Sequence, residues 1–165
     1  MAQHLRILNS KEIKEVHEKL RDQFGFTGKV GAAMLLSEKK EKVYLFTQDL
    51  AGVDISRLRI DTMGLYFASF FGGLIRLSID GSQIVGPRCT KNILDITKEE
   101  MQTWLRGEKL ALSELSRRPD ETPTGFVLVR YGGDYLGCGK IAGDLVLNYI
   151  PKTRYIHATY DDVEE

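Results

Sequence analysis

Residues 125–157 read GFVLVRYGGDYLGCGKIAGDLVLNYIPKTRYIH, and this stretch decides the class of fold. Apolar and β-branched residues fill four short segments, and glycines stand between them. The segments are residues 126–131, 135–141, 145–150 and 154–157. Short strands that recur about every ten residues with glycines at the turns are typical of a small closed β-structure. The C-terminal part of the chain is therefore predicted to form a small β-barrel.

The N-terminal part begins with a predicted amphipathic helix. Asn9 and Glu12 have the spacing of a capping box, and Gly25 is a plausible helix end. Apolar residues then recur every three or four positions on one face, at Ile13, Val16, Leu20 and Phe24. Residues 30–36 and 42–47 flank a charged turn and predict a hairpin. The aromatic segment 64–73 is predicted to pack in the first domain's core. Residues 74–79 alternate like a strand that ends in a turn at Gly81.

The pair Gly86-Pro87 is the strongest signal for a domain boundary. Beyond it we predict a strand over residues 92–96. A helix with a capping box at Thr97 and Glu100 follows, and it ends at Gly107. Residues 110–124 are predicted to form a loop. The expected fold is α+β, with an N-terminal α/β domain over 1–87, a β-barrel over 88–158 and an acidic tail over 159–165.

Composition is that of a globular protein, with 42% hydrophobic and 28% charged residues in a chain of 165. No apolar run is long enough to span a membrane, and the first residues do not resemble a secretory signal. We therefore expect a cytoplasmic protein without a membrane partner. The formal net charge is zero, but the last five residues hold four acids, which leaves 23 bases against 19 acids in the body. This distribution permits a nucleic-acid partner without requiring one.

Familiar enzyme motifs fail at chemically necessary positions. A phosphate-binding loop ending at Gly139-Lys140 would have Asp134 where phosphate lies and Ile141 where a hydroxyl is needed. Residues 137–142 match a relaxed dinucleotide pattern, but no helix follows them. The histidines and paired carboxylates lie in no catalytic or metal-ligand motif, and Cys89 and Cys138 are expected to be buried apolar residues. We expect no catalytic residue, no metal and no cofactor.

A binding surface is the alternative use of the glycine-rich strand. Gly137 and Gly139 would leave one strand face bare, so that a nucleic-acid backbone could approach beside Lys140. Pro151 would present a basic turn, and the end of the second helix would add further cations. The candidate RNA-binding residues are Arg106, Gly137, Gly139, Lys140, Asn148, Tyr149, Lys152 and Arg154. The residues alone leave an equal alternative, in which these are ordinary surface charges and the glycines only turn the corners of the barrel.

Four ordered segments resemble the PUA domain, an RNA-binding β-barrel, in the variant appended to Sun-type RNA cytosine methyltransferases. They are Arg106-Gly-Glu108, Gly125-Phe-Val-Leu-Val129, Leu136-Gly-Cys-Gly-Lys140 and Asn148-Tyr-Ile-Pro-Lys-Thr-Arg154. The resemblance implies that RNA would face the helix end, the glycine-rich strand and the basic turn. The catalytic and methyl-donor domain of those enzymes has no counterpart in this sequence, so their activity is not expected here.

The first half resembles the pre-PUA domain of the Nip-seven ribosome-biogenesis family, in layout and around residues 58–77. Together the two resemblances imply a standalone pre-PUA/PUA protein, archaeal in origin. Its implied function is non-catalytic binding of structured rRNA or tRNA during rRNA maturation or ribosome biogenesis. The alternative is an RNA-binding accessory subunit of a tRNA or rRNA modification enzyme, so the expected protein partners are ribosome-biogenesis or RNA-modification proteins.

Overall fold

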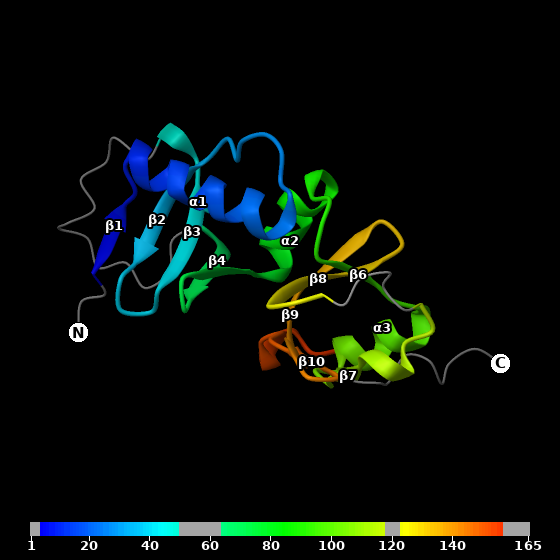
Figure 1. Ribbon diagram of the computed structural model, residues 1–165. Helices are drawn as coiled ribbons and strands as arrows, with labels where there is room; N and C mark the ends of the chain where they lie inside the picture. The colour runs from blue at the N-terminus through cyan, green and yellow to red at the C-terminus, as the bar shows by residue number, and fades with distance from the viewer. Residues whose placement is uncertain (1–3, 50–63, 118–122, 157–165) are drawn as a thin grey trace.

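A computed structural model describes residues 4–49, 64–117 and 123–156 (Figure 1). Two five-stranded sheets lie side by side, and helix α2 (Ile79–Val85) fills the space between them. The α+β fold class is therefore confirmed. The acidic tail over 159–165 lies outside the described residues, and the domain boundary at residue 87 stays a prediction.

The N-terminal sheet is an antiparallel meander in the order β1-β2-β3-β4-β5. Its strands are β1 (Leu5–Ile7), β2 (Ala33–Ser37), β3 (Lys42–Phe46), β4 (Leu65–Phe71) and β5 (Leu74–Leu77). Helix α1 (Ser10–Phe24) covers one face of this sheet (Figure 1). The predicted cap is confirmed, since Asn9 and Glu12 form a reciprocal capping box and Gly25 ends the helix in the left-handed conformation. The predicted hairpin is confirmed as β2 and β3.

Helix α2 corrects the prediction of a strand to residue 79 and a turn at Gly81. Ser78 caps the helix, because its hydroxyl accepts a hydrogen bond from the N–H of Gly81 at 2.9 Å. Gly81 lies inside the helix, where an added Cβ would come within 2.1 Å of the carbonyl oxygen of Phe67. Glycine at this position therefore allows the helix to approach β4 rather than marking a turn.

The C-terminal sheet has the order β6-β8-β9-β10-β7 and is strongly curled (Figure 1). Its strands are β6 (Ile93–Asp95), β7 (Leu110–Ala111), β8 (Phe126–Tyr131), β9 (Asp134–Ala142) and β10 (Leu145–Asn148). Helix α3 (Lys98–Leu105) begins at the predicted capping box and ends before Gly107. Two predictions are wrong in detail. Residues 110–114 hold the short strand β7 and a 3-10 turn instead of a loop. Of the strand predicted over 154–157, Arg154 ends the 3-10 turn η5 (Lys152–Arg154), residues 155–156 form no strand, and residue 157 lies outside the described residues.

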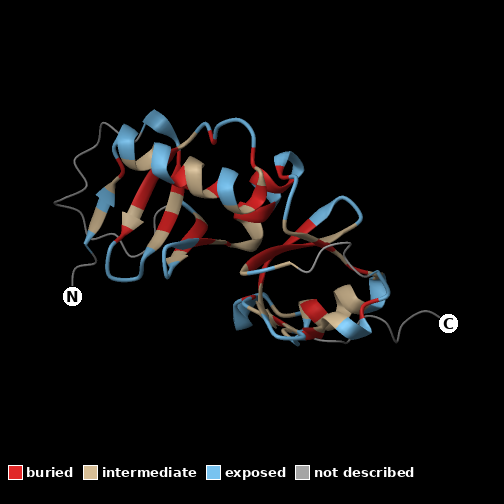
Figure 2. Ribbon diagram, viewed as in Figure 1, coloured by how far each residue is buried: buried red, intermediate tan, exposed pale blue. Residues whose placement is uncertain are grey.

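One hydrophobic core runs through both sheets (Figure 2). Strand β8 is buried on both faces: Phe126 and Leu128 pack toward α1 and α2, whereas Val127 and Val129 pack against Trp104 inside the curled sheet. The sequence of a strand that is buried on both faces is a nearly continuous run of apolar residues, and the sequence of β8 is such a run. The shared core indicates that the two sheets keep a fixed relative position.

A buried hydroxyl joins the sheets through α2. Ser82 is fully buried, donates to the carbonyl of Ile79 at 2.6 Å and accepts from the N–H of Gly137 in β9 at 2.9 Å. The N–H of Gly137 is turned toward α2 because Leu136 and Gly137 together face Val129 in a β-bulge. Removal of the hydroxyl would leave this N–H buried without a partner.

We predict that Ser82→Ala lowers the free energy of unfolding by about 1–3 kcal/mol, the usual cost of one buried unpaired donor. Urea unfolding followed by the fluorescence of Trp104, the single tryptophan, measures the change. The matched control is Thr27→Ala, because Thr27 is exposed. An unfolding midpoint as high in Ser82→Ala as in the control would show that this bond does not join the sheets.

Candidate nucleic-acid interface

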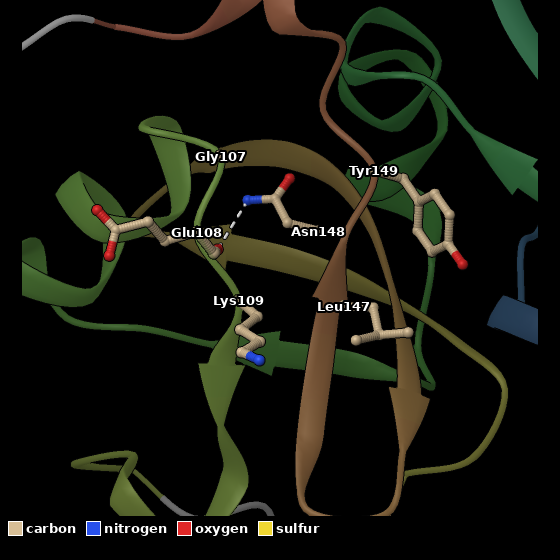
Figure 3. Close-up of a pocket in the computed structure, with 6 residues that line it drawn as sticks. All are labelled: Gly107, Glu108, Lys109, Leu147, Asn148 and Tyr149. Atoms are coloured by element: carbon tan, nitrogen blue, oxygen red, sulfur yellow. Dashed lines mark hydrogen bonds between the residues drawn. The ribbon is translucent and has the colours of Figure 1, made fainter.

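An open groove lies between the end of α3 and strand β10 (Figure 3). It has a volume of about 650 Å³ and is lined by Gly107, Glu108, Lys109, Leu147, Asn148 and Tyr149. We call it the α3–β10 groove. The groove brings together the helix end and two of the predicted RNA-binding residues, Asn148 and Tyr149. Arg106, the capping residue of α3, directly precedes its first lining residue.

Local chemistry explains why the chain turns sharply at this point. Gly107 has φ +87°, and the ring of Tyr155 covers it so closely that a Cβ would lie 2.1 Å from the ring carbon Cζ. Only glycine combines that backbone conformation with that contact. The turn directs Lys109 into the groove, opposite Leu147 (Figure 3).

Asn148 holds the groove together through its side-chain amide. Its amide nitrogen donates to the carbonyl of Glu108 at 3.0 Å (Figure 3) and to that of Trp104 at 2.7 Å. Its amide oxygen accepts from the N–H of Ile150 at 2.9 Å. Both amide hydrogens are therefore used inside the protein. These bonds give Asn148 a structural role, and its role in RNA binding stays a prediction.

The predicted bare face at Gly137 and Gly139 does not exist, because both glycines are buried. An added Cβ at Gly139 would lie 2.5 Å from Cγ1 of Val146 and 2.9 Å from Cη2 of Trp104. One at Gly137 would lie 3.4 Å from Cγ1 of Ile79 in α2. The glycines admit two helices to the strand, so a nucleic-acid backbone cannot lie on them and the prediction of direct contact is wrong.

The predicted cations differ in how far their charge is available. Arg106 pairs with Glu108 at 3.2 Å, and Arg154 pairs with Asp80 of α2 at 3.2 Å, all on the surface. Lys152 is exposed in η5 and Lys109 is exposed in the groove, and neither belongs to an ion pair of the described residues. Surface ion pairs are weak and exchange readily, so Arg106 and Arg154 can still turn toward a phosphate.

Lys140 and Tyr149 are joined through aromatic rings. The Nζ of Lys140 lies 4.9 Å from the ring centre of Phe71 and 5.9 Å from that of Phe126. Phe126 in turn contacts Tyr149 edge to face, with ring centres 6.2 Å apart. Arg76 was not predicted as a binding residue, but its guanidinium carbon lies 4.5 Å from the ring centre of Tyr149. In the sequence, Arg76 stands out as the single charged residue within the apolar strand β5.

The two cysteines of the chain are buried free thiols. Burial raises the pKa of the Cys89 thiol to about 11 and that of the Cys138 thiol to about 12, which confirms both as buried side chains. The described part of the chain contains no cluster of three His, Cys, Asp or Glu side chains that could hold a metal ion. No described helix is long and apolar enough to cross a bilayer.

Comparison with known proteins agrees with this arrangement. Residues 91–156 match the family described as the methyltransferase RsmF PUA domain. The chain carries a PUA domain. In overall structure it is similar to a conserved PUA domain protein from Thermoplasma acidophilum, with a TM-score of 0.60 and 15% identity over 85% of this chain and 81% of that one. The predicted PUA resemblance is therefore confirmed, and the matching family describes a PUA domain rather than a catalytic domain.

Curated relatives extend the likeness beyond the PUA domain. The chain is 27% identical over 139 residues to ribosomal RNA small subunit methyltransferase F of Aeromonas salmonicida, and 25% identical over 144 residues to the same enzyme of Shewanella piezotolerans. These alignments cover 84% and 87% of this chain, so they include part of the N-terminal sheet. The chain spans 28% of the length of each of these two relatives.

We predict that neither thiol reacts with a disulfide reagent at about pH 8 in the folded protein, because only the thiolate is nucleophilic and both pKa values lie far above that pH. Both should react at once in denaturant. Absorbance of the released thiol measures the reaction. Rapid release of one equivalent from the native protein would show that a cysteine is open to solvent.

We also predict that Asn148→Ala lowers the free energy of unfolding by about 1–3 kcal/mol, because two carbonyls and one N–H lose their partner. Thermal unfolding by circular dichroism measures it, with the exposed Thr153→Ala as control. If Asn148→Ala melted like the control and lost RNA binding, Asn148 would be a base-reading residue after all.

Proposed function

We propose that this protein binds structured RNA without catalysing a reaction, and that it acts in the cytoplasm during rRNA maturation or ribosome biogenesis. The observation that carries the proposal is the PUA domain over residues 91–156, with exposed cations beside the α3–β10 groove. The names of the relatives favour small-subunit rRNA over tRNA as the ligand. Cations would hold the sugar-phosphate backbone, while groups in the groove would contact the bases of loops or bulges.

The groove suits this task in its size and in the placement of its charges. It is open and wide enough for an unpaired nucleotide, and Lys109 points into it (Figure 3). Lys152 begins the turn η5 directly after Pro151, and Pro151 follows the groove residue Tyr149 by two positions. The geometry therefore supports one RNA strand that passes from the groove toward the basic turn.

A second candidate function is favoured by the relatives themselves. Because the chain matches only part of a longer rRNA methyltransferase, it could supply RNA affinity to a separate modification enzyme. Cross-linking in the native cells followed by sequencing of the bound RNA separates the two functions. Cross-links next to modified nucleotides favour the accessory role, whereas cross-links confined to precursor rRNA favour a role in maturation.

We predict that Lys109→Gln combined with Lys152→Gln weakens binding to a small-subunit rRNA fragment about ten-fold. The slope of log affinity against log salt should fall by about 1.4–1.8, because each of the two lost phosphate contacts removes about 0.7–0.9. Fluorescence anisotropy at several salt concentrations measures both quantities. The matched control is Lys11→Gln, which removes an exposed lysine of α1. Failure of the unmodified protein to bind any rRNA fragment at low salt would refute the proposed function.

A further inference from the structure

A strip of alternating cations and rings crosses the junction of the two sheets. It consists of Lys42, Arg76 and Lys140 with the rings of Tyr66, Tyr149 and Phe71. The Nζ of Lys42 lies 4.8 Å from the ring centre of Tyr66, and the corresponding distances are 4.5 Å for Arg76 and Tyr149 and 4.9 Å for Lys140 and Phe71. We call it the cation–aromatic strip. The strip and the α3–β10 groove have only one residue in common, Tyr149.

Strand register makes the strip continuous. Lys42 faces Ser69 across β3 and β4, and Ser69 faces Arg76 across β4 and β5, so the two cations lie in one row across the sheet. The rings of Phe71 and Phe126 meet at 6.4 Å, and Phe126 meets Tyr149 at 6.2 Å. The fixed packing of the two sheets thus sets the spacing of all three cations.

The three cations differ from the basic side chains that form ion pairs. Arg6, Arg106, Arg130 and Arg154 each pair with a carboxylate. No carboxylate of the described residues pairs with Lys42, Arg76 or Lys140, and each of the three instead lies over a ring. A cation over a ring keeps its full charge for an anion from solvent. The strip is therefore complementary to a polyanion.

The rings of the strip are open to a ligand. Phe71 is 51% exposed and Tyr149 is 37% exposed, although both are large apolar side chains. Between the sheets, Lys42, Tyr66, Arg76 and Tyr149 also line a pocket of about 90 Å³. That volume equals roughly three water molecules, which suits a phosphate group and is too small for a nucleobase. Phosphates in the pocket and bases on the exposed rings are the two contacts that single-stranded nucleic acid requires.

We propose that the cation–aromatic strip binds a single-stranded segment of RNA, with backbone phosphates at Lys42 and Arg76 and unpaired bases stacked on Phe71 and Tyr149. This inference rests on the proposed function and extends it from the PUA domain to the N-terminal sheet. The RNA bound by this protein then includes unpaired nucleotides next to its structured part. Because the strip contacts phosphates and the faces of bases, it binds RNA segments of different sequence.

The test uses the full chain and two labelled probes, an unstructured oligouridine and an rRNA hairpin with a single-stranded extension. Lys42→Gln with Arg76→Gln should lower the salt slope for oligouridine by about 1.4, since each contact to a single strand contributes about 0.7. Phe71→Leu with Tyr149→Leu should weaken oligouridine binding about ten-fold or more, because leucine fills the space without a stacking face.

Two controls isolate the strip. Arg88→Gln removes a cation that lies 4.9 Å from the ring centre of Phe26, a pair that shares no residue with the strip. Removal of the single-stranded extension from the hairpin should abolish the difference between the strip variants and the unmodified protein.

Each other outcome overturns the inference in a recognisable way. If the strip variants bind both probes normally while Lys109→Gln with Lys152→Gln loses the hairpin, RNA binding stands and the strip is not part of it. Absence of binding to either probe removes the proposed function and the strip together. If the strip variants lose an acidic peptide such as polyglutamate while RNA binding is unchanged, the strip is a protein-binding surface.

Discussion

The placement of the cation–aromatic strip depends on the packing of α2 between the two sheets. Ser82 bonds to the N–H of Gly137 inside the protein, and Phe67, Val85 and Cys138 belong to the same core. Because that core is continuous, Arg76 of the N-terminal sheet meets Tyr149 of the PUA domain at a fixed distance. A flexible linker between two independent domains would not hold such a pair, since inter-domain motion is the usual result of a small interface. The shared core therefore holds the two sheets in one fixed arrangement.

The helices and hairpins that depend on local chemistry were predictable from the sequence. Both capping boxes, at Asn9 and at Thr97, join residues three positions apart, and the structure contains both. Helix α2 was not predictable in this way. It has only seven residues, includes Gly81 and follows an alternating strand, so its local pattern favoured a turn. Contact with β4 and β9 decides its conformation, and that contact involves residues far away in the chain.

The candidate site shows the same limit at the level of single residues. Glycines in a strand indicate that another group comes close, but the sequence does not say which group. At Gly139 the group is Trp104, which lies 35 positions earlier, and at Gly137 it is α2. The cations of the basic turn and the helix end were visible because they accompany family motifs. Lys42 belongs to no motif, and Arg76 lies in the segment that resembles the pre-PUA domain without being a predicted binding residue. The two become significant only when strand register places them in one row, on either side of Ser69.

The distribution of ion pairs explains why a protein of zero net charge is suited to a polyanion. Three of its carboxylates have structural roles. Asp95 binds Arg130 through two hydrogen bonds, which hold the pKa of Asp95 below its usual value, and Glu12 and Glu100 close capping boxes. The cations that remain without a described carboxylate partner include those over exposed rings at the sheet junction. Long-range attraction depends on this local excess of positive charge rather than on the formal total. Net charge therefore understates the affinity for RNA that such a surface can provide.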